Sequence, residues 1–241
     1  MKKYPGLKFS FSSLGCPELN LPEIVALAKV NGINELELRT IDDRVDLPAV
    51  FRDQYGSPSA LKAYLDSEGM RVTALDTSLK LVGGTREDRS AFLEFILWAE
   101  VLETPYLRVF DGGPVAPDLS PEDLQTALET ISWWRDLRKQ NGWKVDIMVE
   151  THDCLTVSTA VAQLQDRLEN PVPVLWDTHH TWKKGEDPKD TWEIVKDSTV
   201  HIHIKDSISE PSARHPMTYV MPGDGEFPLD DTLKLLDFEE D

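Results

Sequence analysis

The sequence predicts an α/β fold of the (β/α) TIM-barrel type, on three observations. Short apolar runs typical of buried strands alternate with longer segments of helical periodicity. The strands begin roughly 25 to 40 residues apart, the spacing of one β-α unit. No glycine-rich phosphate loop follows the first strand, where the chain reads SSLGCPEL, and this disfavours a doubly wound nucleotide-binding sheet.

Seven segments have the composition of parallel strands. Each is a short run rich in Val, Ile, Leu or Phe between turn residues, as expected for strands covered by helices on their faces. The segments are 7–12, 35–39, 70–76, 106–111, 145–150, 172–177 and 200–205. An eighth strand is absent or incomplete, because only DFEED follows the last helical segment.

The helices between the strands are predicted from their caps and apolar stripes. The first begins at Leu21-Pro22 and stops at Asn31-Gly32, and another begins at the capped Ser120-Pro121 and continues towards Asn141-Gly142. The remaining helical segments are 59–67, 86–102, 156–168, 188–196 and 230–236. We expect one domain over residues 1–241.

The charge and composition exclude several classes of function. With 25 basic and 43 acidic side chains the formal net charge is −18, which argues against nucleic-acid binding through phosphate contacts. No run approaches the roughly 20 apolar residues needed to cross a bilayer, so no membrane association is expected. Cys16 and Cys154 cannot form a disulfide framework, and no signal peptide is evident. A reduced, cytoplasmic compartment is the expectation.

Polar side chains gather where the last three predicted strands end. The strands finish as MVETHD, LWDTHH and HIHIKD, and all six histidines lie between positions 152 and 215. In a barrel the carboxyl ends of the strands form the active rim, and neighbouring strands lie about 4.8 Å apart. Glu150, Asp177 and His203 could therefore meet around one ion. The alternative for Glu150 and Asp177 is to cap the helices that follow them.

The donor types of this trio indicate which metal it would hold. Two carboxylate oxygens and one imidazole nitrogen suit Mn²⁺, Mg²⁺ or Co²⁺ foremost, with Zn²⁺ as an alternative. Strand alternation places His201, His203 and Lys205 on one face. Of these, His201 is expected to be structural.

Three further side chains are candidates for substrate binding. Lys205 is expected to meet a hydroxyl, carboxylate or phosphate, with an ion pair to Asp206 or another carboxylate as the alternative. Arg108 would bind a substrate anion or lock a carboxylate of the barrel. His152 would contact substrate or orient a metal ligand through its second ring nitrogen.

Four motifs resemble those of one enzyme superfamily. VET after the fifth strand, LWDTHH with its D-x-x-H spacing, HIHIKD and PGDGEFP are similar to the sugar isomerase/epimerase superfamily, which has the xylose-isomerase-like barrel. The resemblance covers essentially the whole chain. It implies that Glu150, Asp177 and His203 are metal ligands and that His180 contacts substrate. The superfamily's strand-eight glutamate has no counterpart here, and Glu239 or Glu240 is the nearest substitute.

The function expected is divalent-metal-dependent isomerisation or epimerisation of a small sugar or sugar-like carbonyl compound. Glu150 would take the proton next to the carbonyl, and the ion would stabilise the resulting enediolate. The alternatives are a dehydratase of a related polyol ketone and a non-catalytic metabolite-binding barrel that lacks the fourth ligand. Metal-dependent phosphodiester cleavage is disfavoured, because no histidine precedes position 152. The resemblance is also compatible with a homo-oligomer.

Overall fold

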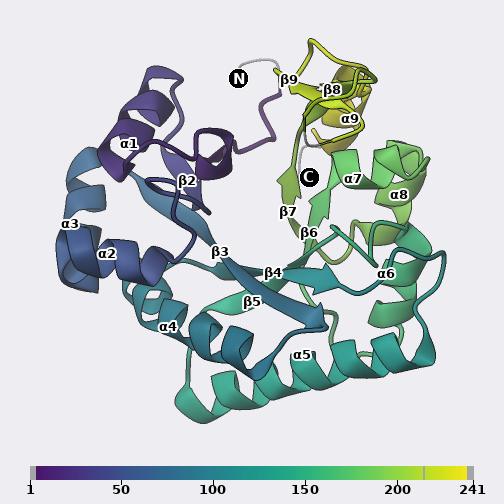
Figure 1. Cartoon of the computed structure of the whole chain (residues 1–241), viewed down its shortest axis with the longest axis horizontal. Coiled ribbons are helices and arrows are strands. Elements are labelled where there is room, and N and C mark those ends of the chain that lie inside the picture. The colour runs from purple at the N-terminus through teal and green to yellow at the C-terminus, as the bar shows by residue number, and fades with distance from the viewer. Residues whose placement is uncertain (1–3, 214, 238–241) are drawn as a thin grey trace. The chain divides into compact units, whose positions relative to one another are not determined.

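The computed structural model describes residues 4–213 and 215–237, and it confirms an α/β fold with seven strands in one sheet (Figure 1). Strand pairing follows chain order from β1 to β7. The strands of this sheet are β1 (Phe11–Ser12), β2 (Glu35–Leu38), β3 (Arg71–Val82), β4 (Tyr106–Gly112), β5 (Asp146–Glu150), β6 (Val174–Asp177) and β7 (Thr199–His203). Among the described residues no eighth strand pairs with β7, as the sequence predicts.

The connecting segments are mostly helical. The helices are α1 (Leu21–Val30), α2 (Leu47–Tyr55), α3 (Pro58–Glu68), α4 (Arg86–Leu102), α5 (Pro121–Asn141), α6 (Ser158–Gln165), α7 (Thr178–Lys183), α8 (Pro188–Val195) and α9 (Leu229–Leu236), with a 3-10 turn at Ser13–Gly15. In the described part of the chain, no helix is both long enough and apolar enough to cross a membrane.

Most helix starts have a polar cap that the sequence reveals. The Asn20 side chain accepts the backbone N–H of Glu23, whose carboxylate in turn accepts the N–H of Asn20, and both distances are 3.0 Å. Thr85 and Asp88 form the same reciprocal capping box at α4. Such caps satisfy N–H groups that the helix itself leaves unpaired, and this is why the predicted starts fall close to the observed ones.

Several elements differ from the sequence prediction. Strand β1 begins at Phe11 instead of residue 7, and β3 continues to Val82 instead of ending at residue 76. Helices α2 and α7 are not predicted, and the seventh strand ends at His203, earlier than the predicted limit at residue 205. Residues Asp206–Ile208 instead form β8, which pairs antiparallel with β9 (Thr218–Val220) in a separate two-stranded sheet. Helix α7 follows β6 without an intervening loop, so no turn residues mark its start.

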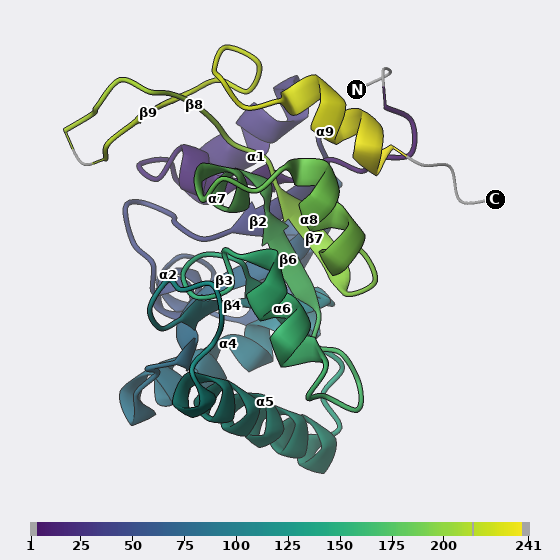
Figure 2. The same ribbon diagram turned by 90° about the vertical axis from the view of Figure 1, so that its right-hand side faces the viewer.

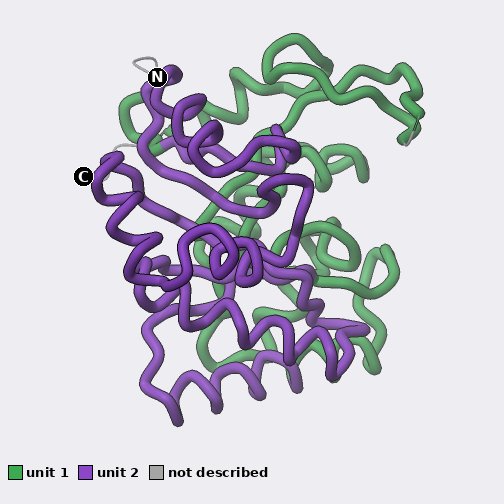
Figure 3. The backbone as a smooth tube through the Cα atoms, turned by 60° about the vertical axis from the view of Figure 1, so that its left-hand side comes forward, with its two compact units in different colours: residues 1–8, 111–128, 149–241 green, residues 9–110, 129–148 purple. Residues whose placement is uncertain are grey.

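The chain divides into two compact units, each coloured separately in Figure 3. Unit 2 comprises Phe9–Phe110 and Glu129–Met148. Its strands β1, β2 and β3 pair in parallel, and their buried residues include Leu36, Leu38 and Leu75. Aromatic packing between Phe51 of α2 and Trp98 of α4, with ring centroids 5.2 Å apart, joins two of its helices.

Unit 1 comprises Met1–Lys8, Asp111–Leu128 and Val149–Asp241. Strands β5, β6 and β7 pair in parallel there, and Trp176 of β6 stacks on Trp192 of α8 at 5.6 Å. The chain then continues through the β8–β9 hairpin to α9, the two elements coloured yellow-green and yellow in Figure 2. The candidate metal ligands all belong to this unit.

Candidate metal centre

The parallel register of unit 1 brings three strand ends to one level. Glu150, the last residue of β5, is paired with Leu175 of β6. Asp177, the last residue of β6, is paired with His203, the last residue of β7. Side chains at such positions project from the carboxyl edge of the sheet, where α/β enzymes place their sites.

Glu150, Asp177 and His203 form a compact cluster of possible metal donors. One ligand atom from each lies within 4.8 Å of the others. The Nδ1 atom of His203 is 3.3 Å from Glu150 Oε1 and 3.6 Å from Asp177 Oδ2. Both carboxylates are buried, with Glu150 3% and Asp177 0% exposed. Two oxygens and one nitrogen in this arrangement fit a hard or borderline divalent cation.

The two oxygens of Asp177 have different partners. Oδ1 accepts the backbone N–H of His180 at 2.9 Å and so caps α7. Oδ2 faces His203 and the ammonium of Lys205, to which it is ion-paired. The backbone N–H of Asp177 donates to Thr151 Oγ1 at 2.9 Å, which fixes the strand end. The helix-capping role and a place in the ligand cluster, weighed as alternatives from the sequence, are therefore combined in Asp177.

Lys205 and Asp177 each favour the charged form of the other. Burial alone raises the pKa of Asp177, but the charge of the Lys205 ammonium and the hydrogen bond from His203 outweigh burial and hold that pKa well below its ordinary value. Burial lowers the pKa of Lys205, whereas Asp177 and Glu150 together raise it above its ordinary value. The site thus contains an ionised Asp177 carboxylate paired with a protonated Lys205.

His180 and His152 lie beside this cluster. His180 Nδ1 is 3.5 Å from Asp177 Oδ2, and its Nε2 is 3.5 Å from the Lys205 ammonium. The rings of His152 and His180 meet edge to face with centroids 4.8 Å apart. Burial lowers the pKa of His180, which keeps this imidazole neutral at physiological pH. His203, His180, Lys205 and His152, which the sequence assigns to metal or substrate binding, are thus near one another.

The sequence did not predict the role of His179. This residue is fully buried, and its Nε2 is 2.9 Å from Ser207 Oγ in β8. Burial lowers its pKa to about 4, so the ring is neutral. It packs against Tyr219 of β9 and Phe227, with centroids 5.5 and 6.4 Å away. His179 therefore joins the helix that carries His180 to the hairpin and the loop after it.

A second acidic cluster, Asp111, His152 and Asp153, lies next to the first. Burial raises the pKa of Asp111 to about 7, although backbone N–H groups of Leu155, Asp153 and His152 oppose the shift. Its two oxygens accept these N–H groups at 2.6 to 3.2 Å. We assign Asp111 to holding the loop after β5, because its oxygens are already committed to the backbone.

Arg108, a candidate from the sequence, and the buried Glu37 lie in unit 2. Arg108 is 2% exposed, donates to Asp76 Oδ2 at 3.1 Å and to the carbonyl of Thr77 at 3.0 Å. Its guanidinium lies 3.9 Å from the centroid of the Phe110 ring. This geometry matches the alternative in which Arg108 locks a barrel carboxylate. Glu37 accepts the hydroxyl of Ser12 at 2.9 Å.

Three further residues that the sequence singles out are Glu239, Glu240 and His201. Glu239 and Glu240, considered as substitutes for a fourth ligand, lie outside the described residues. His201 packs against His203, with ring centroids 5.9 Å apart.

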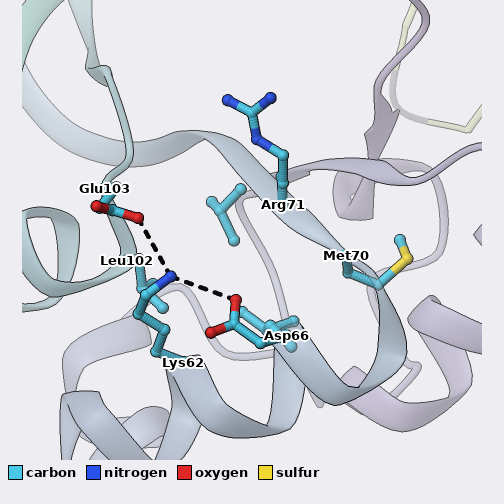
Figure 4. Close-up of a pocket in the computed structure, with 8 residues that line it drawn as sticks. Lys62, Asp66, Met70, Arg71, Leu102 and Glu103 are labelled. Atoms are coloured by element: carbon cyan, nitrogen blue, oxygen red, sulfur yellow. Dashed lines mark hydrogen bonds and ion pairs between the residues drawn. The ribbon is translucent and has the colours of Figure 1, made fainter.

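A cavity of about 290 Å³ in unit 2 has no part in this cluster (Figure 4). Lys62 and Arg71 line it, and Lys62 is paired with Asp66 and Glu103 at 3.2 Å each. No candidate site residue lines this cavity. Its lining balances two cationic side chains against two carboxylates, so it points to no specific ligand chemistry.

Parallel β-α units that bring two carboxylates and an imidazole to one sheet edge define a barrel-type protein with a candidate metal site. A family model described as the xylose isomerase-like TIM barrel matches residues 25–240. The chain belongs to this family, as the sequence motifs suggest.

A curated protein is similar in sequence to about half of the chain. Inosose dehydratase of Clostridium perfringens is 26% identical over 149 residues, which is 56% of this chain and 48% of that protein. The chain thus spans about half the length of the curated relatives that it matches.

Solved structures share the fold at low identity. The probable 3-DHS dehydratase AsbF of Bacillus anthracis has a TM-score of 0.78 and 17% identity, covering 95% of this chain and 89% of that one. The 3-keto-D-glucoside 4-epimerase YcjR of E. coli has a TM-score of 0.70 and 14% identity, with 95% and 87% covered. A D-psicose 3-epimerase has a TM-score of 0.69 and 14% identity, with 95% and 80% covered.

Proposed function

We propose that this protein is a divalent-metal-dependent isomerase or epimerase of a small sugar or sugar-like carbonyl compound. The observation that carries the proposal is the buried cluster of Glu150, Asp177 and His203 at three consecutive strand ends. Family membership supports it, since the similar proteins include epimerases acting on sugar-like compounds.

The proposed metal ligands are Glu150, Asp177 and His203. A divalent ion at these residues supplies a Lewis acid that polarises a carbonyl and a neighbouring hydroxyl oxygen. Mn²⁺, Mg²⁺ and Co²⁺ fit the donor set best. Glu150 and Asp177 are both buried, and among the described residues the Lys205 ammonium is ion-paired with Asp177 alone, so a cation would compensate the second carboxylate.

The chain's own residues would carry out the proton transfer. The Glu150 carboxylate accepts the proton from the carbon next to the carbonyl. Lys205 and His180 bind substrate oxygens, because an ammonium and an imidazole lie 3.5 Å apart beside Asp177. His152, whose ring contacts that of His180, is the third polar side chain that would contact the substrate. Returning the proton to the other face gives an epimer, and returning it to the neighbouring carbon gives an isomer.

Dehydration of a polyol ketone is the second candidate. It is favoured by the comparisons, because both inosose dehydratase and the 3-DHS dehydratase are dehydratases. Proton removal by Glu150 is common to both reactions. Elimination additionally needs an acid to protonate the departing hydroxyl, and the protonated Lys205 would supply that proton.

The test is proton exchange in heavy water. The metal-free chain is loaded with Mn²⁺, Mg²⁺ or Co²⁺ and incubated with ketoses and cyclic polyol ketones. Deuterium at the carbon next to the carbonyl, followed by NMR, marks proton abstraction. A new sugar then identifies isomerisation or epimerisation, whereas loss of water with a new ultraviolet-absorbing enone identifies dehydration.

Two controls make the result specific. The Glu150→Gln variant should lose exchange, and the Glu193→Gln variant on the exposed face of α8 should keep it. Metal binding without exchange on any compound would support the non-catalytic, metabolite-binding alternative. Absence of metal binding would refute the site. The oligomeric state is a prediction that gel filtration with light scattering would test.

A further inference from the structure

We infer that Lys205 is the internal counter-ion of the metal-free site, and that its ammonium gives up Asp177 Oδ2 when a divalent cation binds. The inference rests on the proposed metal site, but it concerns a different property: how the chain tolerates the site when no metal is bound. It makes Lys205 a determinant of metal affinity as well as of substrate contact.

The division of work between the Asp177 oxygens is the first step. Oδ1 is committed to the cap of α7 through the backbone N–H of His180 at 2.9 Å. Only Oδ2 faces the donor cluster, and the Lys205 ammonium is paired with that atom. A cation that uses Asp177 must therefore bind at the oxygen that the lysine holds.

The charge balance of the site is the second step. Glu150 and Asp177 are 3% and 0% exposed, so their charges receive little help from solvent. An isolated buried carboxylate is strongly unfavourable unless a cation or several hydrogen bonds compensate it. Lys205 is the side chain that meets Asp177 with a full positive charge, and Glu150 also acts on it. It thus stabilises the folded chain before metal is loaded.

The reach of Lys205 is the third step. Its Cα lies just beyond β7, which ends at His203, and its side chain is 26% exposed. A flexible four-carbon stem lets the ammonium move while the backbone stays fixed. The imidazole of His180, 3.5 Å from the ammonium, offers an alternative partner nearby.

Lys205 stabilises the metal-free site, but the same positive charge opposes metal binding. A positive charge beside the ligand oxygen repels an incoming divalent cation. Lys205 should therefore raise the stability of the metal-free protein and lower its affinity for metal. Replacing the lysine by an uncharged side chain of similar length should reverse both effects.

The experiment compares Lys205→Met, Lys205→Arg and wild type by two measurements. Thermal unfolding is followed in chelator, and Mn²⁺ affinity is measured by electron paramagnetic resonance of the free ion. For Lys205→Met we expect a lower Tm in chelator and an affinity for Mn²⁺ at least ~10-fold tighter, because the repulsion is removed. Lys205→Arg keeps the positive charge and should retain the wild-type Tm in chelator. If Lys205→Met does not fold, the Tm and Mn²⁺ affinity of Lys205→Arg still test the role of the charge.

The exposed Lys234→Met variant on α9 is the matched control and should change neither quantity. An unchanged Tm in chelator for Lys205→Met would overturn the counter-ion role. Equal or weaker Mn²⁺ binding by that variant would overturn the exchange of lysine for metal. If wild type binds no Mn²⁺, the proposed function fails together with the exchange, whereas Mn²⁺ binding unaffected by Lys205→Met refutes this inference alone.

Discussion

The Asp206 carboxylate accepts the backbone N–H of Phe227 at 3.0 Å, although the two residues lie 21 positions apart in the chain. The same oxygen, Oδ1, accepts the N–H of Ser207, and Oδ2 accepts those of Gly223 and Gly225, all at 2.8 to 3.0 Å. One buried side chain therefore fixes the loop between β9 and α9. That loop carries Phe227, which packs on His179 in the helix that also carries His180.

Asp206→Asn should destabilise the protein strongly at neutral pH. An amide offers one acceptor oxygen, so its NH₂ group would face two N–H donors; the expected loss is about 2 kcal/mol of unfolding free energy. Burial raises the pKa of Asp206, but the four N–H groups outweigh it and hold the pKa below the ordinary 3.8. The ionised Asp206 carboxylate therefore contributes its full stabilisation when the pH is above its unfolded-state pKa. This contribution is lost as the pH falls through the folded-state pKa of Asp206.

Urea unfolding of wild type and Asp206→Asn at several pH values measures how much the Asp206 carboxylate contributes to the unfolding free energy. The difference in unfolding free energy should be largest near pH 7 and should shrink below about pH 4. Asp224→Asn serves as the control in the same loop, because Asp224 is exposed. A difference that stays constant down to pH 3 would contradict the assigned role of the carboxylate.

Gly225→Ala should destabilise the same loop by a steric route. A Cβ atom there would fall within contact distance of the Asp206 carboxylate and 2.7 Å from the carbonyl oxygen of Ser207. Overpacking of this kind typically costs about 1–3 kcal/mol. Gly15→Ala is the control, since a Cβ at Gly15 meets nothing within 4 Å. Equal urea unfolding midpoints for Gly225→Ala and Gly15→Ala would show that the loop accommodates the added methyl group without a loss of stability.

Arg108→Met should unfold unit 2 more easily, because it leaves the Asp76 carboxylate buried without its guanidinium. The pair is 2% and 0% exposed at its side chains, and removing one member of such a pair typically costs about 3–5 kcal/mol. Circular dichroism during urea unfolding would measure the loss. The double variant Arg108→Met with Asp76→Asn should recover part of it. A stable single variant with altered substrate affinity would instead support the substrate-binding prediction for Arg108.

The grouping of Glu150, Asp177 and His203 could be predicted because the first two end predicted strands and the third lies two residues before the predicted end of the next strand. Apolar runs marked β5, β6 and β7, and the parallel topology then placed Glu150, Asp177 and His203 at the same edge. Strand composition is a local property, and the alignment of strand ends follows from the βα repeat. This part of the site required no knowledge of tertiary contacts.

The partners of these residues could not be predicted in the same way. Asp111 lies at the end of β4, but it accepts hydrogen bonds from the backbone N–H groups of His152 and Leu155, which lie 41 and 44 positions later in the chain. His179 depends on Ser207 in a hairpin whose sequence, DSISEPSARHPMTYV, has no regular alternation. Long-range polar contacts depend on the fold as a whole, so local propensity does not reveal them.

Glu150→Gln should separate metal binding and proton transfer from stability. The amide keeps the size of the side chain but weakens the ligand, and losing even an outer partner of a metal ligand costs about 10–100-fold in affinity or activity. We therefore expect Mn²⁺ affinity to fall at least ~100-fold. Exchange at the carbon next to a substrate carbonyl should fall by about 10²–10⁴-fold if Glu150 is also the base.

The stability of the metal-free protein should respond in the opposite direction. Glu150 and Asp177 are both buried beside one ammonium, so neutralising Glu150 relieves repulsion between like charges. Urea unfolding in chelator should give an equal or higher midpoint for Glu150→Gln than for wild type, and Glu193→Gln should match wild type throughout. A lower midpoint with unchanged Mn²⁺ affinity would mean that Glu150 supports the scaffold through its contact with His203, 3.3 Å away, and is not a ligand.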